Sequence, residues 1–248
     1  MLKKERHAYI MREIDIHNKV LSSDLSIQLT VSEDTIRRDL QELDDNGILT
    51  KVHGGALSKS FHFTLQNNTV YSQPEKKIIA QKARELIKDG MLVLLSGGTT
   101  IIELIKSLPH ELNATFITVS IPTALELLDH PNGEVIFIGN KLLKSAQMSV
   151  GAEVVQRLSE IKCDLCFLGT NSIDVENGIT DLDLEVIEVK RAMIRSAKKT
   201  VSLSISKKLN TVQRMVVCKI GEVDVLITEL DPGDALLAPY HSKISTII

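Results

Sequence analysis

Hydrophobic residues recur at helical spacing between Ser32 and Leu43. Ile36, Leu40 and Leu43 follow one another at intervals of four and three residues, so they form one apolar stripe that faces a core. Ser32 is a favourable N-cap for such a helix. The pattern therefore predicts an amphipathic helix with a polar outer face.

The outer face of this predicted helix carries side chains that suit contact with DNA. Asp34, Arg38 and Gln41 lie opposite the apolar stripe, and Thr35 and Arg37 flank it. An arginine can bind a guanine edge through two hydrogen bonds or clamp a phosphate, and two adjacent arginines near the start of an exposed helix are typical of a recognition helix. The alternative is a solvated face with ion pairs four residues apart, such as Asp34 with Arg38.

The segments on either side favour the DNA-binding interpretation. Residues 21–29 predict a short capped helix, and Thr30-Val31 then makes the tight connection of a helix-turn-helix. Asn46-Gly47 ends the recognition helix. Residues 48–57 alternate apolar and polar positions around Gly54-Gly55, which predicts a small hairpin, or wing.

Two further segments define the domain organisation. Residues 3–17 predict a supporting helix whose Ile10 and Ile14 face the recognition helix. Residues 58–75 are rich in Ser, Asn, Gln and Thr, which indicates a linker. We therefore expect a DNA-binding domain over residues 1–57, a linker over 58–75 and a second domain over 76–248.

The first domain resembles the DNA-binding domain of the DeoR family of bacterial repressors. The resemblance rests on Thr35-Ile36-Arg37-Arg38-Asp39-Leu40, Leu43, Gly47, Lys51 and His53-Gly54-Gly55-Ala56. It implies operator binding by a winged helix-turn-helix. The residues that we expect at the DNA are Ser32, Thr35, Arg37 and Arg38 of the helix and Lys51, His53, Gly54 and Gly55 of the wing.

The second domain alternates short apolar strands with amphipathic helices. Strands are expected over residues 91–95, 115–119, 135–138, 163–168, 201–203, 215–217 and 223–228, and helices over 76–88, 100–108, 123–128, 152–160 and 184–198. Such alternation indicates a largely parallel sheet covered on both faces. The predicted fold class is α/β, with the winged helix-turn-helix followed by a Rossmann-like domain.

A candidate ligand loop follows the first strand of this predicted sheet. Ser96-Gly97-Gly98-Thr99-Thr100 lies where a strand runs into a helix, and ligands of parallel sheets bind at the carboxyl ends of the strands. Glycines let backbone N–H groups approach a phosphate, and the helix dipole favours negative charge. The loop is neither a P-loop nor a dinucleotide fingerprint, and taken alone it is more often an ordinary tight turn.

The resemblance to the DeoR family extends over this domain. The family's effector domain is similar to sugar-phosphate isomerases, which implies a sugar-phosphate-isomerase-like fold and a phosphorylated sugar as effector. Matching positions include Gly98-Thr99-Thr100, Gly151, Gly178-Ile179-Thr180 and Ser206-Lys207. The effector-binding residues that it implies are Ser96, Gly97, Gly98, Thr99, Thr100, Thr118, Ser120, Gly139 and Lys207, with Glu185 and Lys190 as looser candidates.

Four positions depart from the family pattern. Ser96 and Ser204 replace acids, Val119 replaces an asparagine, and Asn140 replaces a glycine. Because carboxylates typically hold sugar hydroxyls, these changes predict a different sugar preference or weaker binding. The alternatives are an isomerase with an added DNA-binding module, which would need a general base that Ser96 and Ser204 do not supply, or a DNA-binding protein whose sensor site has decayed.

Composition narrows the class of protein further. The net charge of −3, and nine Lys or Arg against ten Asp or Glu in the first 60 residues, argue against a protein that coats nucleic acid. No apolar run is long enough to span a bilayer, so we expect a cytoplasmic protein. A near-neutral winged helix makes few phosphate contacts alone, which predicts a homo-oligomer.

Cysteine and histidine usage predicts neither a metal nor a cofactor. Cys163 and Cys166 have the spacing of half a metal motif, but they lie in a predicted buried strand. Residues three apart on a strand point to opposite faces, so the two thiols would not share a metal ion.

Overall fold

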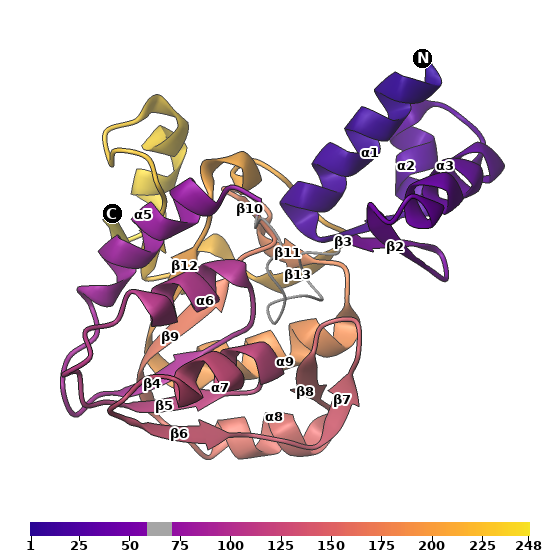
Figure 1. The fold of residues 1–248 in the computed structure, drawn as a ribbon. Helices are drawn as coiled ribbons and strands as arrows, with labels where there is room; N and C mark the ends of the chain where they lie inside the picture. The colour runs from indigo at the N-terminus through magenta and orange to yellow at the C-terminus, as the bar shows by residue number, and fades with distance from the viewer. Residues whose placement is uncertain (59–70) are drawn as a thin grey trace. The chain divides into compact units, whose positions relative to one another are not determined.

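The computed structural model describes residues 1–58 and 71–248. Contacts divide the chain into two compact units, Met1–Tyr71 and Ser72–Ile248 (Figure 1). Among the described residues, no helix combines the length and the apolar character that crossing a bilayer requires.

The N-terminal unit is a winged helix-turn-helix. Its elements are α1 (Lys3–His17), β1 (Lys19–Leu21), α2 (Ser22–Leu29), α3 (Glu33–Asp45), β2 (Leu49–Val52) and β3 (Gly55–Ser58). Strand β3 lies between β1 and β2 and pairs antiparallel with both. The fully buried side chains of Ile10, Ile14, Ile36, Leu40 and Leu49 join the three helices to this sheet, as the apolar stripe predicted.

The second unit is built on a seven-stranded parallel sheet. Its strand order is β15-β14-β12-β9-β4-β5-β6, and all six neighbouring pairs are parallel. The strands are β4 (Leu92–Leu95), β5 (Thr115–Thr118), β6 (Glu134–Phe137), β9 (Cys163–Gly169), β12 (Ala197–Leu203), β14 (Val225–Ile227) and β15 (Thr246–Ile247). The chain leaves β4 toward β5 and later places β9 on the other side of β4, so the strand order reverses between β4 and β9.

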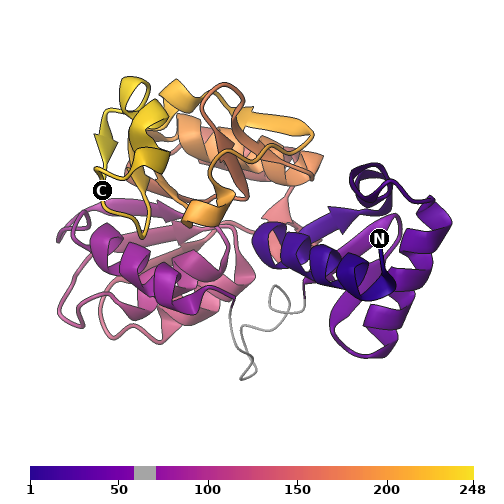
Figure 2. The ribbon, with the colours of Figure 1, turned by 90° about the horizontal axis from the view of Figure 1, so that it is seen from above.

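Helices cover both faces of this sheet. They are α5 (Gln73–Arg84), α6 (Thr99–Lys106), α7 (Ile121–Leu128), α8 (Ala152–Ser159) and α9 (Leu184–Arg195), with three short 3-10 helices, η1 (Ser206–Lys208), η2 (Ile220–Glu222) and η3 (Ala235–Ser242). Helices α5 to α7 pack on one face, and α8 and α9 pack on the other (Figure 1). In Figure 2 the magenta segments of α5 to α7 and the orange segments around α9 lie on opposite sides of the domain.

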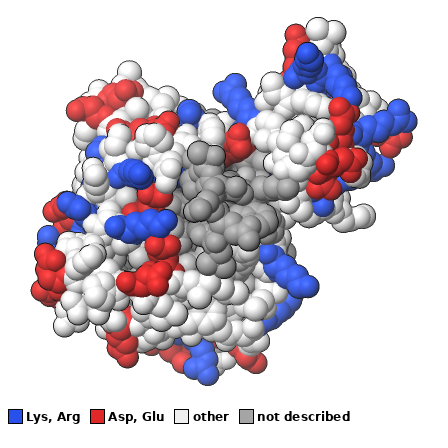
Figure 3. All heavy atoms as spheres, in the orientation of Figure 1, with Lys and Arg blue, Asp and Glu red and all other residues white. Residues whose placement is uncertain are grey.

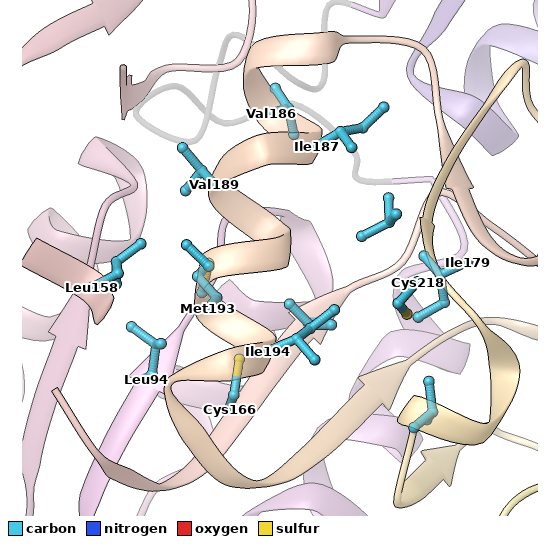
Figure 4. Close-up of a cluster of buried hydrophobic side chains, with 14 of the residues drawn as sticks. Leu94, Leu158, Cys166, Ile179, Val186, Ile187, Val189, Met193, Ile194 and Cys218 are labelled. Atoms are coloured by element: carbon cyan, nitrogen blue, oxygen red, sulfur yellow. The ribbon is translucent and has the colours of Figure 1, made fainter. Parts of the chain in front are cut away.

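The core under α9 explains why this helix forms where it does. Val189 and Met193 are fully buried and recur four residues apart on the inner side of the helix. Figure 4 shows Met193 beside Leu94 of β4 and Cys166 of β9. Helix α9 is thus held by packing against the central strands, and it reaches the carboxyl end of the sheet with its first turns.

Two small antiparallel sheets complete the domain. They are β10 (Ser172–Asp174) with β11 (Gly178–Asp181) and β13 (Met215–Cys218), and the hairpin of β7 (Lys141–Leu143) with β8 (Met148–Val150). The strand predicted over residues 215–217 exists, but it pairs with β11 and does not belong to the parallel sheet.

Several predicted boundaries differ from those of the structure. Helix α5 begins at Gln73, inside the predicted linker, and ends at Arg84 and not at residue 88. Ser58, the first residue of that predicted linker, is instead the last residue of β3. Helix α9 ends at Arg195, because the chain turns directly into β12. Residues 59–70, the remainder of the predicted linker up to Tyr71, lie outside the described residues.

Candidate functional site

The start of α3 is shaped by a hydroxyl pair. The Ser32 side chain caps the helix by accepting a hydrogen bond from the Thr35 backbone N–H at 3.3 Å. The two side-chain hydroxyls lie 2.9 Å apart. Ser32 is exposed and Thr35 is half-buried, so both predicted DNA-contact residues lie at the surface with their hydroxyls joined.

The two arginines of α3 have different surroundings. Arg37 donates hydrogen bonds to Glu33 and Asp34, both at 3.2 Å. Arg38 is exposed and forms no ion pair within residues 1–58 and 71–248. Asp34 therefore pairs with Arg37 and not with Arg38, the example named for a solvated face, whereas Glu33 and Arg37 do form an ion pair four residues apart. Exposed ion pairs of this kind contribute little, so Arg37 can exchange its partners for a phosphate at small cost.

The wing is tied to the recognition helix. Lys51 of β2 donates to the side-chain oxygen of Gln41 at 2.8 Å, and Gln41 donates to Asp45 at 2.7 Å. His53 and Gly54 form the exposed turn of the wing, and Gly54 has a φ of +78°, which favours glycine.

Gly55 has a packing role. It is buried in β3, and a Cβ at this position would lie 1.9 Å from the Val20 carbonyl oxygen of β1. Glycine is therefore required for β1 and β3 to pair closely. This residue supports the wing from inside, whereas His53 and Gly54 are available at its surface.

The sequence interpretation missed a buried tie between α1 and α3. Asp39 is 3% exposed and accepts hydrogen bonds from Arg6 Nε at 2.7 Å and Nη2 at 3.1 Å. His7 Nε2 lies 3.2 Å from the same carboxylate. Burial alone would raise the pKa of Asp39, but the hydrogen bonds and charges of Arg6 and His7 hold it below its ordinary value. Arg6 is thus committed to positioning the recognition helix.

Charges on the visible surface of the N-terminal unit are mixed. Figure 3 shows acidic and basic side chains side by side on this unit. Lys3 of α1, for example, forms an ion pair with Glu42 of α3. The face that Figure 3 shows therefore has no patch of basic side chains alone on this unit.

In the second unit, Ser96 joins β4 to β9 at their carboxyl ends. Its backbone N–H donates to Phe167 O at 3.0 Å, and its side-chain oxygen accepts from the Gly169 backbone N–H at 2.7 Å. The strand order reverses between these two strands, and ligands of parallel sheets bind in the crevice at such a point. The predicted loop therefore lies where the topology favours a ligand.

The loop offers unpaired backbone donors. Gly98 has a φ of +121° and occupies the N-cap position of α6. Within the described part of the chain, the backbone N–H groups of Gly98, Thr99 and Thr100 donate no hydrogen bond. Thr99 is half-buried at the first position of the helix. These groups can receive an anion at the positive end of the helix dipole.

Two predicted effector residues support the loop from behind. Thr118 is fully buried and donates to Leu95 O at 2.8 Å. Ser120 caps α7, and a Cβ on Gly97 would lie 3.0 Å from its Oγ, which is a tight contact. Thr123, which the sequence interpretation missed, donates to Ser96 O at 2.9 Å. All three hydroxyls are engaged within the protein.

Two further predicted residues lie nearer the surface. Gly139 is exposed beyond the end of β6. Lys207 is exposed in η1, where its ammonium donates to Ser72 Oγ at 3.2 Å and lies 3.6 Å from Glu75 Oε1. Glu185, a looser candidate, pairs with Lys141 at 2.7 Å.

Three lysines with little solvent exposure gather at the carboxyl ends of the central strands. Lys208 donates to Thr170 O at 2.7 Å, and Lys190 donates to Gly169 O at 3.2 Å. Burial, followed by the charges of Lys76 and Lys190, lowers the pKa of Lys208 to about 7. We call Lys76, Lys190 and Lys208 the lysine cluster.

One carboxylate pairs with Lys190 of this cluster. Asp181 is 6% exposed and accepts a hydrogen bond from Lys190 at 2.9 Å. Burial would raise the pKa of Asp181, but the charge and hydrogen bond of Lys190 hold it below its ordinary value. Lys190 was a looser candidate, whereas Lys76, Lys208 and Asp181 were missed because they come from α5, η1 and β11.

The four departures from the family pattern have different surroundings. Val119 is fully buried, and Ser204, 1% exposed, donates to Ile205 O. Asn140 is exposed and hydrogen-bonded to Glu153, whereas Ser96 holds β9 as described above. Ser96 is therefore the departure that lies directly in the loop.

The cysteines form no metal site among the residues that the structure describes. Cys163, Cys166 and Cys218 are buried and free. Burial raises the pKa of Cys163 to about 11 and of Cys218 to about 12, so both remain protonated thiols at neutral pH. No group of three potential metal ligands occurs in residues 1–58 and 71–248.

Comparison with known proteins gives two domain matches that together span most of the chain. Residues 6–61 match the model of a DeoR-like helix-turn-helix domain, and residues 72–230 match the model of a DeoR C terminal sensor domain. The chain is 32% identical to the HTH-type transcriptional regulator GolR of Listeria innocua, over 97% of this chain and 96% of that protein. It is 33% identical to the HTH-type transcriptional repressor GlcR of Bacillus subtilis, over 95% and 92% of the two chains.

Solved structures give a weaker likeness. A D-ribose-5-phosphate isomerase in complex with phospho-erythronic acid has a TM-score of 0.39 and 19% identity, covering 54% of this chain and 52% of that one. Likeness at this level carries no conclusion about activity.

Proposed function

Because this chain belongs to the DeoR family of DNA-binding transcriptional regulators, we propose that it is a repressor of carbohydrate genes whose operator affinity is changed by a phosphorylated sugar. On this proposal, the exposed end of α3 and the wing bind the operator. The carboxyl ends of β4 and β9 bind the effector. The relatives' names support a regulator, and the two sites described above support its two binding activities.

The DNA side of the proposal rests on Arg38. Its guanidinium is exposed and unpaired among the described residues, on the helix face opposite the core. Arg37 reaches the flank of that face, and Lys51 and His53 lie in the wing. Base contacts from Arg38 and Thr35, with phosphate contacts from Arg37, Lys51 and His53, fit the way a recognition helix docks in the major groove.

The observation that carries the effector side is the set of backbone N–H groups at Gly98, Thr99 and Thr100, which donate no hydrogen bond among the described residues. In the same domain, burial and the charges of Lys76 and Lys190 lower the pKa of Lys208 to about 7. A dianionic phosphate would compensate these charges. The free backbone donors of Thr99 and Thr100 supply further hydrogen bonds to an anion.

We propose sensing and not catalysis for this site. An isomerase needs a general base close to the substrate, and Asp181 is held by Lys190. Ser96 and Ser204 stand where the family pattern has acids, and their hydroxyls make hydrogen bonds within the protein. Incubating the protein with a panel of sugar phosphates and following isomer formation by NMR should give no conversion.

The central experiment measures operator binding with and without effector. Wild-type protein would first select its operator from a random DNA library. Titrations would then be repeated with a panel of pentose and hexose phosphates. We expect one or more members to change operator affinity about 5- to 150-fold, the usual range of allosteric coupling. If calorimetry shows no binding of any member and none changes operator affinity, the sensor proposal fails and the decayed-site alternative replaces it.

Thr99→Val tests the placement of the effector. The substitution keeps the side-chain volume and removes one hydroxyl at the start of α6. It should weaken the effector response and leave effector-free operator binding intact. Thr115→Val, on the half-buried first residue of β5, is the matched control and should respond as wild type.

A further inference from the structure

Three side chains meet where the second unit begins. Lys207 of η1 donates to Ser72 Oγ at 3.2 Å and lies 3.6 Å from Glu75 Oε1. A hydrogen bond from its own backbone N–H, together with the charge of Lys207 and the hydroxyl of Ser72, holds the pKa of Glu75 below its ordinary value. We call Ser72, Glu75 and Lys207 the latch.

The backbone of Ser72 is in a conformation that serine avoids. Its φ of 51° and ψ of 39° place it in the left-handed region, which is unfavourable for residues other than glycine and asparagine. An N-cap normally has an extended backbone and bonds the first turn through its side chain, but Ser72 makes no such cap bond. Its side chain instead meets Lys207 and Glu75, so the latch helps to hold a strained residue in place.

The latch lies next to both parts of the proposed effector site. In the first turn of α5, Gln73 donates to Glu103 of α6 at 3.2 Å, and α6 begins at the glycine-threonine loop. Lys76 belongs to the same turn, and its positive charge contributes to lowering the pKa of Lys208. Lys207 immediately precedes Lys208 in η1, so the two side chains start from neighbouring backbone positions.

The position of the latch along the chain gives it a route to the DNA-binding unit. The division between the two compact units falls between Tyr71 and Ser72. A change at Ser72 therefore acts on the first residue of the effector domain. Relaxation of a left-handed residue changes the direction of the backbone at Tyr71, the described residue before it.

We propose that an anionic effector draws Lys207 away from Glu75 and Ser72, and that opening of this latch passes effector binding to the N-terminal unit. The inference rests on the proposed effector site. In the free protein, Glu75 competes with the effector for Lys207 and Ser72 stays left-handed. In the bound protein, Lys207 turns to the anion, and the start of α5 is released.

Two latch variants and one control test this proposal in the full-length chain. Ser72→Gly accepts the left-handed backbone without strain and removes the hydroxyl, and Glu75→Gln keeps the shape of the side chain and removes its charge. Glu85→Gln, on the exposed end of α5, is the matched control. Each protein would be titrated with the selected operator, with and without a saturating concentration of each pentose and hexose phosphate of the panel.

The measured quantity is the ratio of operator dissociation constants with and without sugar phosphate. We expect this ratio to move at least threefold toward one in both latch variants and to stay at the wild-type value in Glu85→Gln. Glu75→Gln should also bind the active sugar phosphate more tightly than wild type, because Lys207 no longer has to leave a carboxylate. If both latch variants keep the wild-type ratio within twofold, the latch proposal is wrong, whereas the proposal that the protein senses a sugar phosphate still stands.

Hydrogen exchange in the wild-type protein gives a second readout that does not depend on how the variants fold. The backbone amide of Lys76, which donates to Ser72 O at 3.1 Å, should exchange faster when the active sugar phosphate is bound, because the first turn of α5 is released. Unchanged or slower exchange there contradicts the latch. If no sugar phosphate alters operator binding by the wild type, the proposed function fails, and the latch fails with it.

Discussion

On the proposed function, single side chains of α3 and the wing divide into groups that read bases and groups that hold phosphates. Arg38 has no ion-pair partner in the described residues, whereas Lys51 is bonded to Gln41 beside the wing. Arg38→Ala should reduce discrimination between the operator and mismatched DNA by about 1 to 3 kcal/mol, whereas Lys51→Ala should weaken binding to all sequences and lower the salt slope by about one. Mobility-shift titrations at several salt concentrations measure both effects.

A control and a contradicting result complete this prediction. Lys88→Ala, an exposed substitution in the effector domain, should leave operator binding unchanged. Wild-type affinity and selectivity in both Arg38→Ala and Lys51→Ala would show that another surface binds the operator.

The protonation of Lys208 makes effector binding depend on pH. The pKa of Lys208 is about 7 in the free protein, so part of the population is neutral above pH 7. A bound anion favours the charged form and raises this pKa, so binding at pH 8 should take up a fraction of a proton. Effector affinity should then fall as the pH rises above 7, once the phosphate is fully ionised.

Calorimetry in two buffers with different ionisation enthalpies measures this proton uptake. The difference in observed heat gives the number of protons bound. Lys208→Met should remove the uptake, and Lys219→Met, an exposed lysine after β13, should retain it. An equal uptake by Lys208→Met and wild type would assign the proton to another group.

At the level of elements, the orientation of α3 depends on α1 through one carboxylate. Asp39→Asn keeps the shape of the side chain but loses the charge that Arg6 and His7 share. Hydrogen bonds to charged groups contribute about 1.5 to 3 kcal/mol, so the N-terminal unit should lose roughly that much free energy of unfolding. Differential scanning calorimetry of the full chain should show the unfolding transition of the N-terminal unit move to lower temperature. The transition of the second unit should stay at its wild-type temperature.

The pH dependence of the same contact has a definite sign. The pKa of Asp39 is lowered in the folded state, so its contribution is fully present above the ordinary pKa of an aspartate and is lost as the pH falls through the lowered value. Wild type and Asp39→Asn should therefore converge in stability on acidification. Asp45→Asn, on the exposed end of α3, is the control and should follow the wild type. A stability gap that persists at low pH would mean that Asp39 acts through packing and not through charge.

Elements with a clear period were predictable, and contacts between distant segments were not. The stripe of Ile36, Leu40 and Leu43 fixed α3 and its exposed face because each position is set by neighbours in sequence. Strand β1 has three residues, which is too short for a period, and it becomes a strand only by pairing with β3. Pairing with a distant strand therefore determines the secondary structure of β1, which the local sequence pattern does not predict.

The candidate site shows the same limit. Gly98-Thr99-Thr100 could be found because the loop is contiguous and lies at a strand-helix junction. The lysine cluster could not be found, since Lys76, Lys190 and Lys208 look like surface lysines of amphipathic helices until the sheet brings them together. Likewise, Thr118 and Ser120 were predicted as ligand contacts, but their hydroxyls are used to build the loop.

For the whole molecule, charge sets a limit on how the operator is held. The chain has a net charge of −3, and the visible surface of the N-terminal unit carries both signs. Affinity for DNA grows with the number of phosphates neutralised, and one such unit offers few cations that are free of acidic partners. A second copy on the same DNA would double these contacts and add the gain from linked binding. We therefore propose a homo-oligomer, at least a dimer.

Symmetry of the operator gives the sharpest test of this oligomer. Two copies related by a two-fold axis should bind two half-sites about 34 to 36 Å apart, on one face of the DNA. Inserting half a helical turn between the half-sites should cost most of the affinity, because the second recognition helix would then face the wrong side. Inserting a full turn should restore part of the affinity.

Light scattering should give a multiple of 27.5 kDa at micromolar protein. A mass of one chain with and without DNA, together with equal affinity for one and two half-sites, would show that a single copy holds the operator.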